Sequence, residues 1–116
     1  MSDQQDQQLF QIQNILETLL EATDHFSKLV QQRDFPQSVY TFTSITEGAG
    51  AVAHSLIELN KDFTDHTDKL ASILVKIKNQ LEDNNLPGIP SSLTDSLSQE
   101  FKHILKKFQE AYGNQK

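Results

Sequence analysis

Apolar residues in the first part of the chain recur at alternating intervals of three and four residues. The positions on this stripe are Leu9, Ile12, Leu16, Leu19, Phe26 and Val30, and Thr23 fills the gap between Leu19 and Phe26. Because an α-helix turns once in 3.6 residues, such spacing places the side chains on one helix face. The pattern predicts an amphipathic helix over about residues 4 to 33, which contains no glycine or proline.

The same spacing returns in three later segments. The second stripe is Val39, Phe42, Ile45, Ala49, Val52, Ala53, Leu56 and Leu59, the third is Leu70, Ile73, Leu74, Ile77 and Leu81, and the last is Leu93, Leu97, Phe101, Ile104, Leu105, Phe108 and Tyr112. These stripes predict helices over about 36–60 and 67–83. They also predict a final helix that Ser91 or Ser92 caps and Gly113 ends.

Turn-forming residues separate the predicted helices. Asp34 is expected to cap the second helix, and Pro36 suits its first turn, where a missing N–H costs nothing. A turn is expected at about 61–66, where the sequence is mostly polar. The stretch 84–90 holds two prolines and a glycine and cannot continue a helix.

Four amphipathic helices with short connections predict an all-α fold, an antiparallel up-down four-helix bundle that forms one domain over 1–116. An alternative stays open, because the apolar phase runs from Phe35 to Ile77 without a break. In that alternative, three helices include one long helix over 36–83. We favour four helices, because the long helix would measure about 70 Å and little chain would remain to cover it.

Two glycines lie inside the predicted second helix, at Gly48 and Gly50. Each costs about 1 kcal/mol relative to alanine in a helix interior. We expect them to allow close approach of a neighbouring backbone, since Gly48 shares a stripe with Ile45 and Val52. A kink at this point is the competing interpretation.

Composition and charge exclude several classes of function. The formal net charge of −6 argues against non-specific binding of nucleic acid or of an anionic membrane. Lys102, Lys106 and Lys107 form the only candidate basic patch, interpreted as a solvated helix end. The absence of cysteine excludes disulfides and thiolate metal sites. No secretory signal and no apolar run of about 20 residues is present, so we expect a cytoplasmic protein.

Acidic and histidine residues offer two weak metal patterns. Glu100 and His103 have the spacing used in di-iron bundles, but the second such pair that a di-iron site needs is missing. The densest acidic cluster comprises Asp62, Asp65, His66 and Asp68. We interpret this cluster as a solvated turn in which Asp65 or Thr67 caps the third helix. No metal and no cofactor is therefore expected.

The residues Ala53-His54-Ser55-Leu56 resemble the start of the motif around the phosphorylated histidine in histidine-phosphotransfer domains, which are also four-helix bundles. The resemblance implies that His54 would carry a phosphoryl group. In that family lysine and glycine follow three and four residues after the histidine, whereas this chain has Ile57 and Glu58. A carboxylate one turn from His54 would oppose an anionic phosphoryl group.

The leading hypothesis is a small helical protein–protein interaction module, such as an adaptor, an export-chaperone-like protein or an assembly subunit, without catalytic activity. The first helix, at about 45 Å, is expected to project beyond the others and to meet a protein partner or a second copy. The residues expected to carry this contact are Leu9, Phe10, Ile12, Ile15 and Leu16. Phosphotransfer through His54 is the alternative function.

Overall fold

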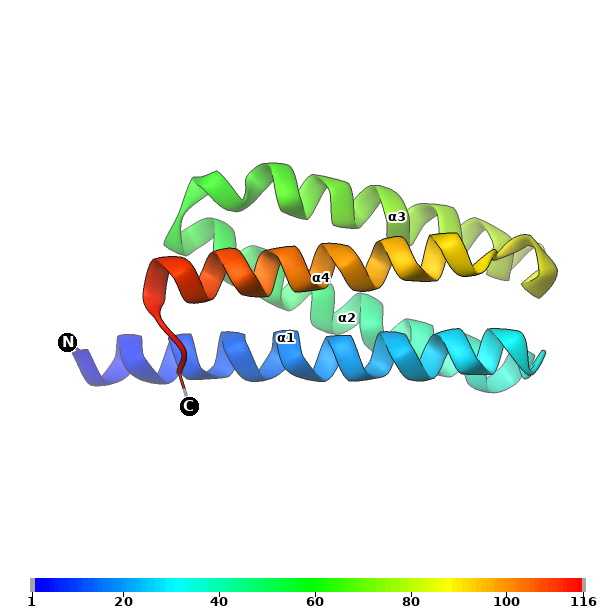
Figure 1. Cartoon of the computed structure of the whole chain (residues 1–116), viewed down its shortest axis with the longest axis horizontal. Coiled ribbons are helices and arrows are strands. Elements are labelled where there is room, and N and C mark those ends of the chain that lie inside the picture. Colours follow the sequence, from blue (N-terminus) through cyan, green and yellow to red (C-terminus); the bar gives the residue numbers. More distant parts are fainter. Residues whose placement is uncertain (1, 116) are drawn as a thin grey trace.

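The computed structural model describes residues 2–115, with side chains from residue 4 onward. Its α-helices are α1 (Ser2–Gln31), α2 (Phe35–Leu59), α3 (Thr64–Glu82) and α4 (Ser91–Tyr112), and its short 3-10 helices are η1 (Lys61–Phe63) and η2 (Leu86–Gly88). The helices run alternately up and down (Figure 1), so the predicted antiparallel four-helix bundle is confirmed.

The alternative with one helix over 36–83 is wrong. The chain leaves helical geometry at Asn60, whose backbone is extended, with φ −161° and ψ 117°. The Asn60 side chain accepts a hydrogen bond of 2.9 Å from the backbone N–H of Asp62. This Asx-type contact starts η1, which reverses the chain before α3 begins.

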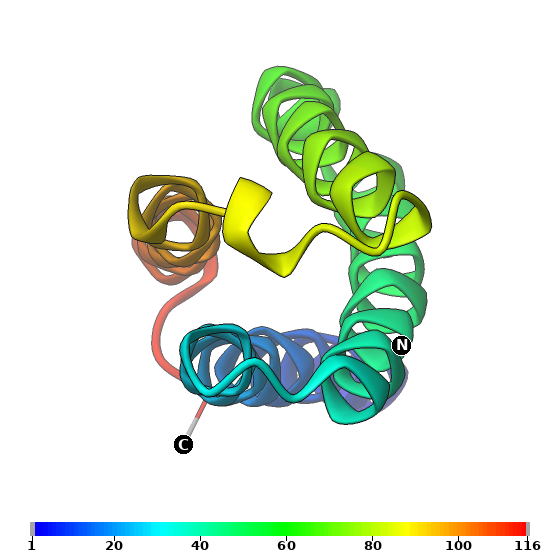
Figure 2. The same ribbon diagram turned by 90° about the vertical axis from the view of Figure 1, so that its right-hand side faces the viewer.

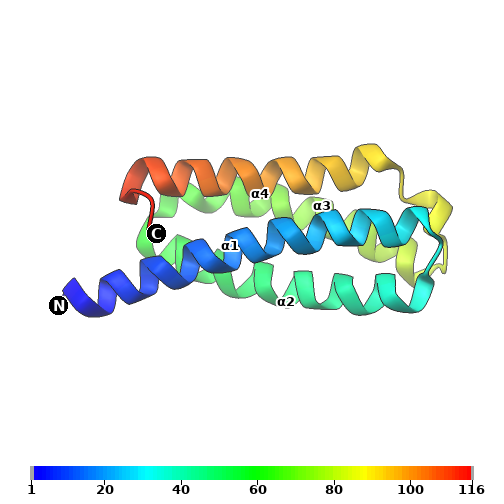
Figure 3. The same cartoon turned by 60° about the horizontal axis from the view of Figure 1, so that its bottom comes forward.

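The four helices do not pack equally against one another. In Figure 3, α1 lies between α2 and α4, and α3 packs on α4. Figures 1 and 2 show that α2 runs obliquely, since it begins beside α1 and ends at the turn that leads into α3. The contact between α2 and α3 is consequently the weakest between neighbouring helices.

The core consists of the predicted stripes. Its fully buried large side chains include Leu16, Phe26, Ile45, Leu56, Phe63, Ile77, Leu97, Phe101, Ile104 and Phe108. One end of the bundle is closed by η2 and the residue after it, through the buried side chains of Leu86 and Ile89. The loop predicted at 84–90 therefore contributes two buried side chains to the core, although most of its other residues are exposed.

Several predicted helix ends are confirmed by their local chemistry. The Asp34 carboxylate accepts a hydrogen bond of 3.2 Å from the backbone N–H of Gln37, and Pro36 lies in the first turn of α2. Gly113 follows α4 with a positive φ of 83°, a conformation in which glycine lacks the steric penalty of other residues.

Two predicted caps are wrong. The third helix begins at Thr64 rather than at 67, and the residue in its N-cap position, Phe63, makes no side-chain cap hydrogen bond. The backbone of η1 leads directly into α3, so that neither Asp65 nor Thr67 is needed as a cap. At α4 the N-cap position falls on Pro90, and neither predicted serine caps the helix.

The two glycines of α2 differ in their surroundings. A methyl group added at Gly48 would lie 3.0 Å from Cδ2 of Leu19, so this glycine admits a close approach of α1, through a side chain rather than the expected backbone. A methyl group added at Gly50 would meet nothing within 4 Å. The helix continues through both positions.

The residues after α4 return to α1. The side-chain amide of Gln13 donates to the Oδ1 atom of Asn114 at 2.9 Å, and its oxygen accepts from the backbone N–H of Gln115 at 2.8 Å. Both ends of the described chain therefore lie at the same end of the bundle (Figure 1). Over the described residues, no helix has the length and apolar character needed to cross a membrane.

Candidate interaction groove

Four large apolar side chains are exposed among the described residues, and three of them lie on α2 and α3. The large hydrophobic residues that remain exposed, among those described, are Phe10, Val39, Tyr40 and Val75. Tyr40 is the most exposed, at 71%, and Val75 is exposed at 54%. Single exposed apolar residues are ordinary, but a contiguous group of them marks a surface that can bind another molecule.

A groove of about 480 Å³ lies between α2 and α3, and we call it the α2/α3 groove. It is lined by Phe35, Val39, Phe42, Thr43, Thr46, Glu47, Lys78, Leu81 and Glu82. Its floor is apolar, because Phe42 and Leu81 are core residues whose outer edges reach it. Polar side chains stand at its rims.

Helix divergence produces this groove. The turn at η1 holds the end of α2 near the start of α3, while the other ends of these two helices separate (Figure 2). Val39 was predicted to belong to the core stripe of the second helix, but it is 36% exposed. Val39 lines the groove together with Leu81 of α3, because the first turns of α2 diverge from α3 and leave a depression between the two helices.

Helical register extends the apolar surface beyond the lining residues. Positions seven residues apart lie on nearly the same face, since a helix turns once in 3.6 residues. Tyr40 is seven residues before Glu47, and Val75 is seven residues before Glu82. Tyr40 and Val75 thus share helix faces with Glu47 and Glu82, two of the residues that line the groove.

The structure corrects the predicted partner surface on the first helix. Leu9, Ile12 and Leu16 are buried in the core, where they contact the rest of the bundle instead of projecting beyond it. Ile15 is partly buried and lines a smaller groove between α1 and α2. Phe10 alone among the five predicted residues is exposed, at 45%. The described part of α1 that remains uncovered precedes Leu9 and is polar.

His54 lies on α2 with 76% of its side chain exposed, as a phosphoryl acceptor would need. Its Nε2 atom is 2.9 Å from Oε1 of Glu58, one turn further along the helix. Glu58 stands four residues after His54, at the position where the histidine-phosphotransfer motif has glycine. This pairing opposes a phosphoryl group on His54.

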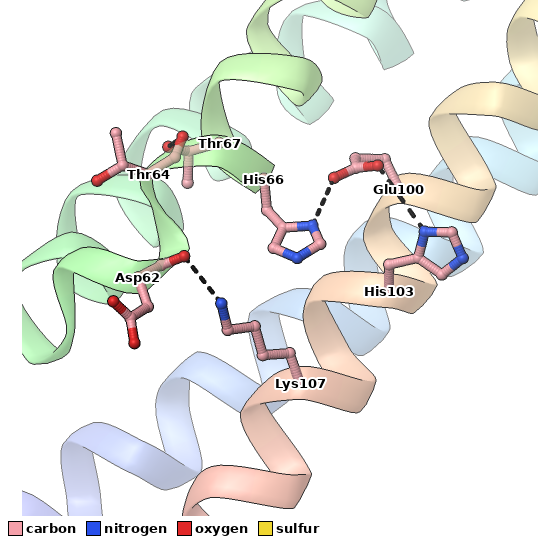
Figure 4. Close-up of polar contacts among 7 residues, drawn as sticks. All are labelled: Asp62, Thr64, His66, Thr67, Glu100, His103 and Lys107. Carbon is pink, nitrogen blue, oxygen red and sulfur yellow. Dashed lines mark hydrogen bonds and ion pairs between the residues drawn. The ribbon is translucent and has the colours of Figure 1, made fainter.

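A polar cluster joins α3 to α4 (Figure 4). The Nδ1 atom of His66 lies 2.9 Å from Oε1 of Glu100, and Nδ1 of His103 lies 3.9 Å from Oε2 of the same carboxylate. The Glu100 side chain is only 9% exposed, and that of His66 is 27% exposed. Because buried carboxylates are costly without partners, the cluster fixes the register of α3 on α4.

The acidic cluster predicted around His66 is not brought together. His66 turns toward Glu100 on α4, and the Asp62 backbone carbonyl accepts a hydrogen bond of 2.8 Å from Nζ of Lys107. The same ammonium group stands 5.1 Å from the centre of the Phe63 ring. Lys107 therefore ties α4 to η1 and is not part of a free basic patch. In the chain from residue 2 to 115, no three acidic or histidine side chains converge as metal ligands.

Two features of the molecule were not predicted from the sequence, namely the burial of Glu100 and the α2/α3 groove. The buried Glu100 could have been found, because it lies three residues from Leu97 and four from Ile104 and so borders the core stripe of the last helix. The α2/α3 groove had a weaker indication. Tyr40 and Val75 are large apolar residues outside the stripes of their helices.

The fold and the groove define a small four-helix-bundle protein with one long apolar depression between two diverging helices. Residues 9–98 match the family described as a domain of unknown function, DUF8042, and the chain belongs to that family. No curated protein and no solved structure matches the chain. The matched region contains all residues that line the α2/α3 groove.

Proposed function

We propose that this protein is a non-catalytic protein–protein interaction module, whose docking site for a partner protein is the α2/α3 groove. The observation that carries the proposal is the exposed side chain of Val39 at a groove whose floor, formed in part by Phe42 and Leu81, is apolar. Removing such surface from water drives association at about 25 cal/mol for each Å² of apolar area buried, before the costs of binding are subtracted.

The groove has the anatomy of a binding surface. Apolar side chains occupy its floor, while Thr43, Glu47 and Lys78 at the rims can form hydrogen bonds and ion pairs with a partner. Adaptors, export chaperones and assembly subunits all act through surfaces of this kind. The groove lies between two helices that are already folded, so binding a partner does not require this part of the chain to become ordered.

The test compares partner capture by matched variants of the full chain. Val39→Glu and Val75→Glu place a charge at the α2/α3 groove, and Phe10→Glu places the same charge on the distant exposed residue of α1. All three sites are exposed, so the fold should persist, as circular dichroism would check. A partner that co-purifies stoichiometrically with the wild type and with Phe10→Glu, but not with the groove variants, is the expected result.

A partner retained by both groove variants would place the docking site elsewhere on the molecule. If only Phe10→Glu abolishes capture of that partner, the docking site lies on α1, as the sequence predicted.

A further inference from the structure

The helix α2 carries far less charge than the other three helices. Its 25 residues include two acidic residues, Glu47 and Glu58, and no lysine or arginine. Each of α1, α3 and α4 contains six acidic or basic residues, histidine apart. An outer helix of a soluble protein presents charged side chains to water, whereas surfaces that bind another protein are depleted of charge at their centre. The composition of α2 therefore indicates a surface that is covered in an assembly.

The outer face of α2 points away from the core, and no other described helix lies over it (Figure 2). We define this face by six exposed residues that are spaced alternately by four and three positions, namely Tyr40, Ser44, Glu47, Ala51, His54 and Glu58. This spacing places all six on one side of the helix, and it is the spacing through which two helices pack along their length. The α2/α3 groove lies to one side of the outer face and shares only Glu47 with it.

Two copies of the chain can pack these faces against each other about a twofold axis. Such an axis makes α2 of the second copy antiparallel to α2 of the first, and every contact then occurs twice. If Glu47 faces His54 of the second copy, the axis passes between Gly50 and Ala51, which are midway between those positions. The two helices then cross at the smallest side chains of this region, which permits a close approach.

Charge complementarity selects this register over its neighbours. The Nε2 atom of His54 is 2.9 Å from Glu58, and the Nδ1 atom has no partner among the described residues. The protonated ring can therefore donate a second hydrogen bond to Glu47 of the second copy. Moving the second copy by one turn would place Glu47 opposite either Ala51 or Glu58, so that the pairing would be lost or like charges would meet.

Two residues of α2 that contribute nothing to the bundle have a role in this pairing. A methyl group added at Gly50 would meet nothing within 4 Å, although glycine is among the least favourable residues in a helix interior. Tyr40 leaves 71% of its surface exposed, and tyrosine is enriched where proteins bind one another. Pairing through the outer face of α2 covers Tyr40 and uses the small size of Gly50.

We infer that the outer face of α2 binds a second copy of this chain, in an antiparallel pairing about a twofold axis between Gly50 and Ala51, with Glu47 of each copy facing His54 of the other. The inference does not rest on the proposed function, because it uses a different side of α2. Since each copy contributes one helix to a small contact, we expect a reversible dimer with a Kd in the micromolar range.

Sedimentation velocity of the full chain tests the association, at physiological salt where exposed charges more than about 8 Å apart are screened. The wild type should change from monomer at about 1 μM toward dimer at about 100 μM. Ala51→Glu brings two added carboxylates together at the axis and should weaken the dimer about tenfold. Ala111→Glu, which adds the same charge to an exposed position of α4, should not weaken it. A wild type that stays monomeric, or equal weakening by both variants, would overturn the inference.

A charge swap tests the register. Glu47→Lys removes the partner of His54, and His54→Glu brings two carboxylates together, so each should weaken the dimer at least about fivefold. The double variant places lysine opposite glutamate and should recover the dimer. Glu110→Lys is the control, because it changes the net charge as Glu47→Lys does, at an exposed position of α4. Absence of recovery in the double variant would contradict the proposed pairing.

Failure of the inference can be separated from failure of the proposed function. A dimer that Val39→Glu dissociates and Ala51→Glu leaves intact would place the second copy in the α2/α3 groove, and the inference would be wrong. The expected result is the reverse, a dimer that Ala51→Glu weakens and Val39→Glu retains. Capture of a partner protein by the groove variants is a different measurement and tests the proposed function alone.

Discussion

The two glycines of α2, Gly48 and Gly50, have different surroundings. The first is in contact with Leu19 of the neighbouring helix, and the second faces open space. A difference in stability between variants at these positions would measure the contact directly, since the helix propensity of the two positions is the same.

We predict that Gly50→Ala stabilises the protein by about 1 kcal/mol, because alanine is the better helix former and no atom lies in its way. Gly48→Ala should stabilise less or destabilise, since Leu19 must move to admit the methyl group. Urea denaturation followed by circular dichroism measures both. A larger gain at Gly48 than at Gly50 would contradict the packing described for α1 and α2.

Ser38 is a polar residue that the core tolerates at a cost. It is fully buried in α2, and its hydroxyl oxygen has no hydrogen-bond partner among the described residues. We predict that Ser38→Ala stabilises the protein by about 1 kcal/mol, because it removes an unpaired buried group and favours the helix.

The control for this variant is Ser44→Ala, at an exposed position of the same helix. Its hydroxyl is hydrogen-bonded to the Tyr40 carbonyl at 3.4 Å, and the change in stability should stay within about 0.5 kcal/mol. Thermal unfolding of the two variants measures both changes in stability. Destabilisation by Ser38→Ala would mean that its hydroxyl has a partner in solution.

At the scale of helices, one buried polar contact helps to hold α3 against α4. Removing the imidazole in His66→Ala leaves the Glu100 carboxylate buried without its 2.9 Å partner, and should cost about 1–3 kcal/mol. Glu100→Gln should cost less, because it removes the buried charge and keeps an acceptor. Denaturation of both single variants and the double variant gives the coupling between the two residues.

A matched control for this pair is available on α2. His54 and Glu58 form a contact of the same 2.9 Å length, but both side chains are more than half exposed. His54→Ala should therefore change the free energy of unfolding by no more than about 0.5 kcal/mol. Equal losses of stability in His66→Ala and His54→Ala would contradict the expectation that burial of Glu100 makes its contact with His66 the stronger of the two.

Helix ends could be predicted from the sequence where they depend on neighbouring residues. Asp34 and Gly113 are examples, because a cap and a positive φ are local properties. The start of α3 could not be predicted, since it depends on the extended backbone of Asn60 and on Phe63 becoming fully buried.

The α2/α3 groove was also beyond prediction from one chain. Apolar periodicity says which face of a helix is buried, but the angle between two helices depends on how all four pack together. Val39 matched the stripe of its helix but is exposed, because it lines the groove between the diverging helices α2 and α3.

For the molecule as a whole, α3 is the helix that the bundle holds least firmly. It packs on α4 along its length, but it touches α2 mainly near η1. Helices with fewer buried contacts open locally at a lower free energy. We predict that the backbone amides of α3 exchange with deuterium faster than those in the middle of α1 or α4.

Hydrogen-exchange mass spectrometry of the free protein tests this prediction. The middle of α1 serves as the internal reference, because α1 is flanked by both α2 and α4. Protection of α3 equal to that of α1 would mean that the two sides of the α2/α3 groove are held together more firmly than their packing indicates. A partner docked in the groove should slow exchange in the last turns of α3, which line it.

The antiparallel course of an even number of helices has a practical consequence for attachment. Both ends of the described chain lie at the pole that also holds η1 (Figure 1), while the residues that line the α2/α3 groove belong to the first half of α2 and the last turns of α3, toward the opposite pole. The long dimension of the molecule is 47 Å. A molecule tethered to a surface or fused to a larger protein through either end would thus hold the groove outward, where an approaching partner meets no obstruction.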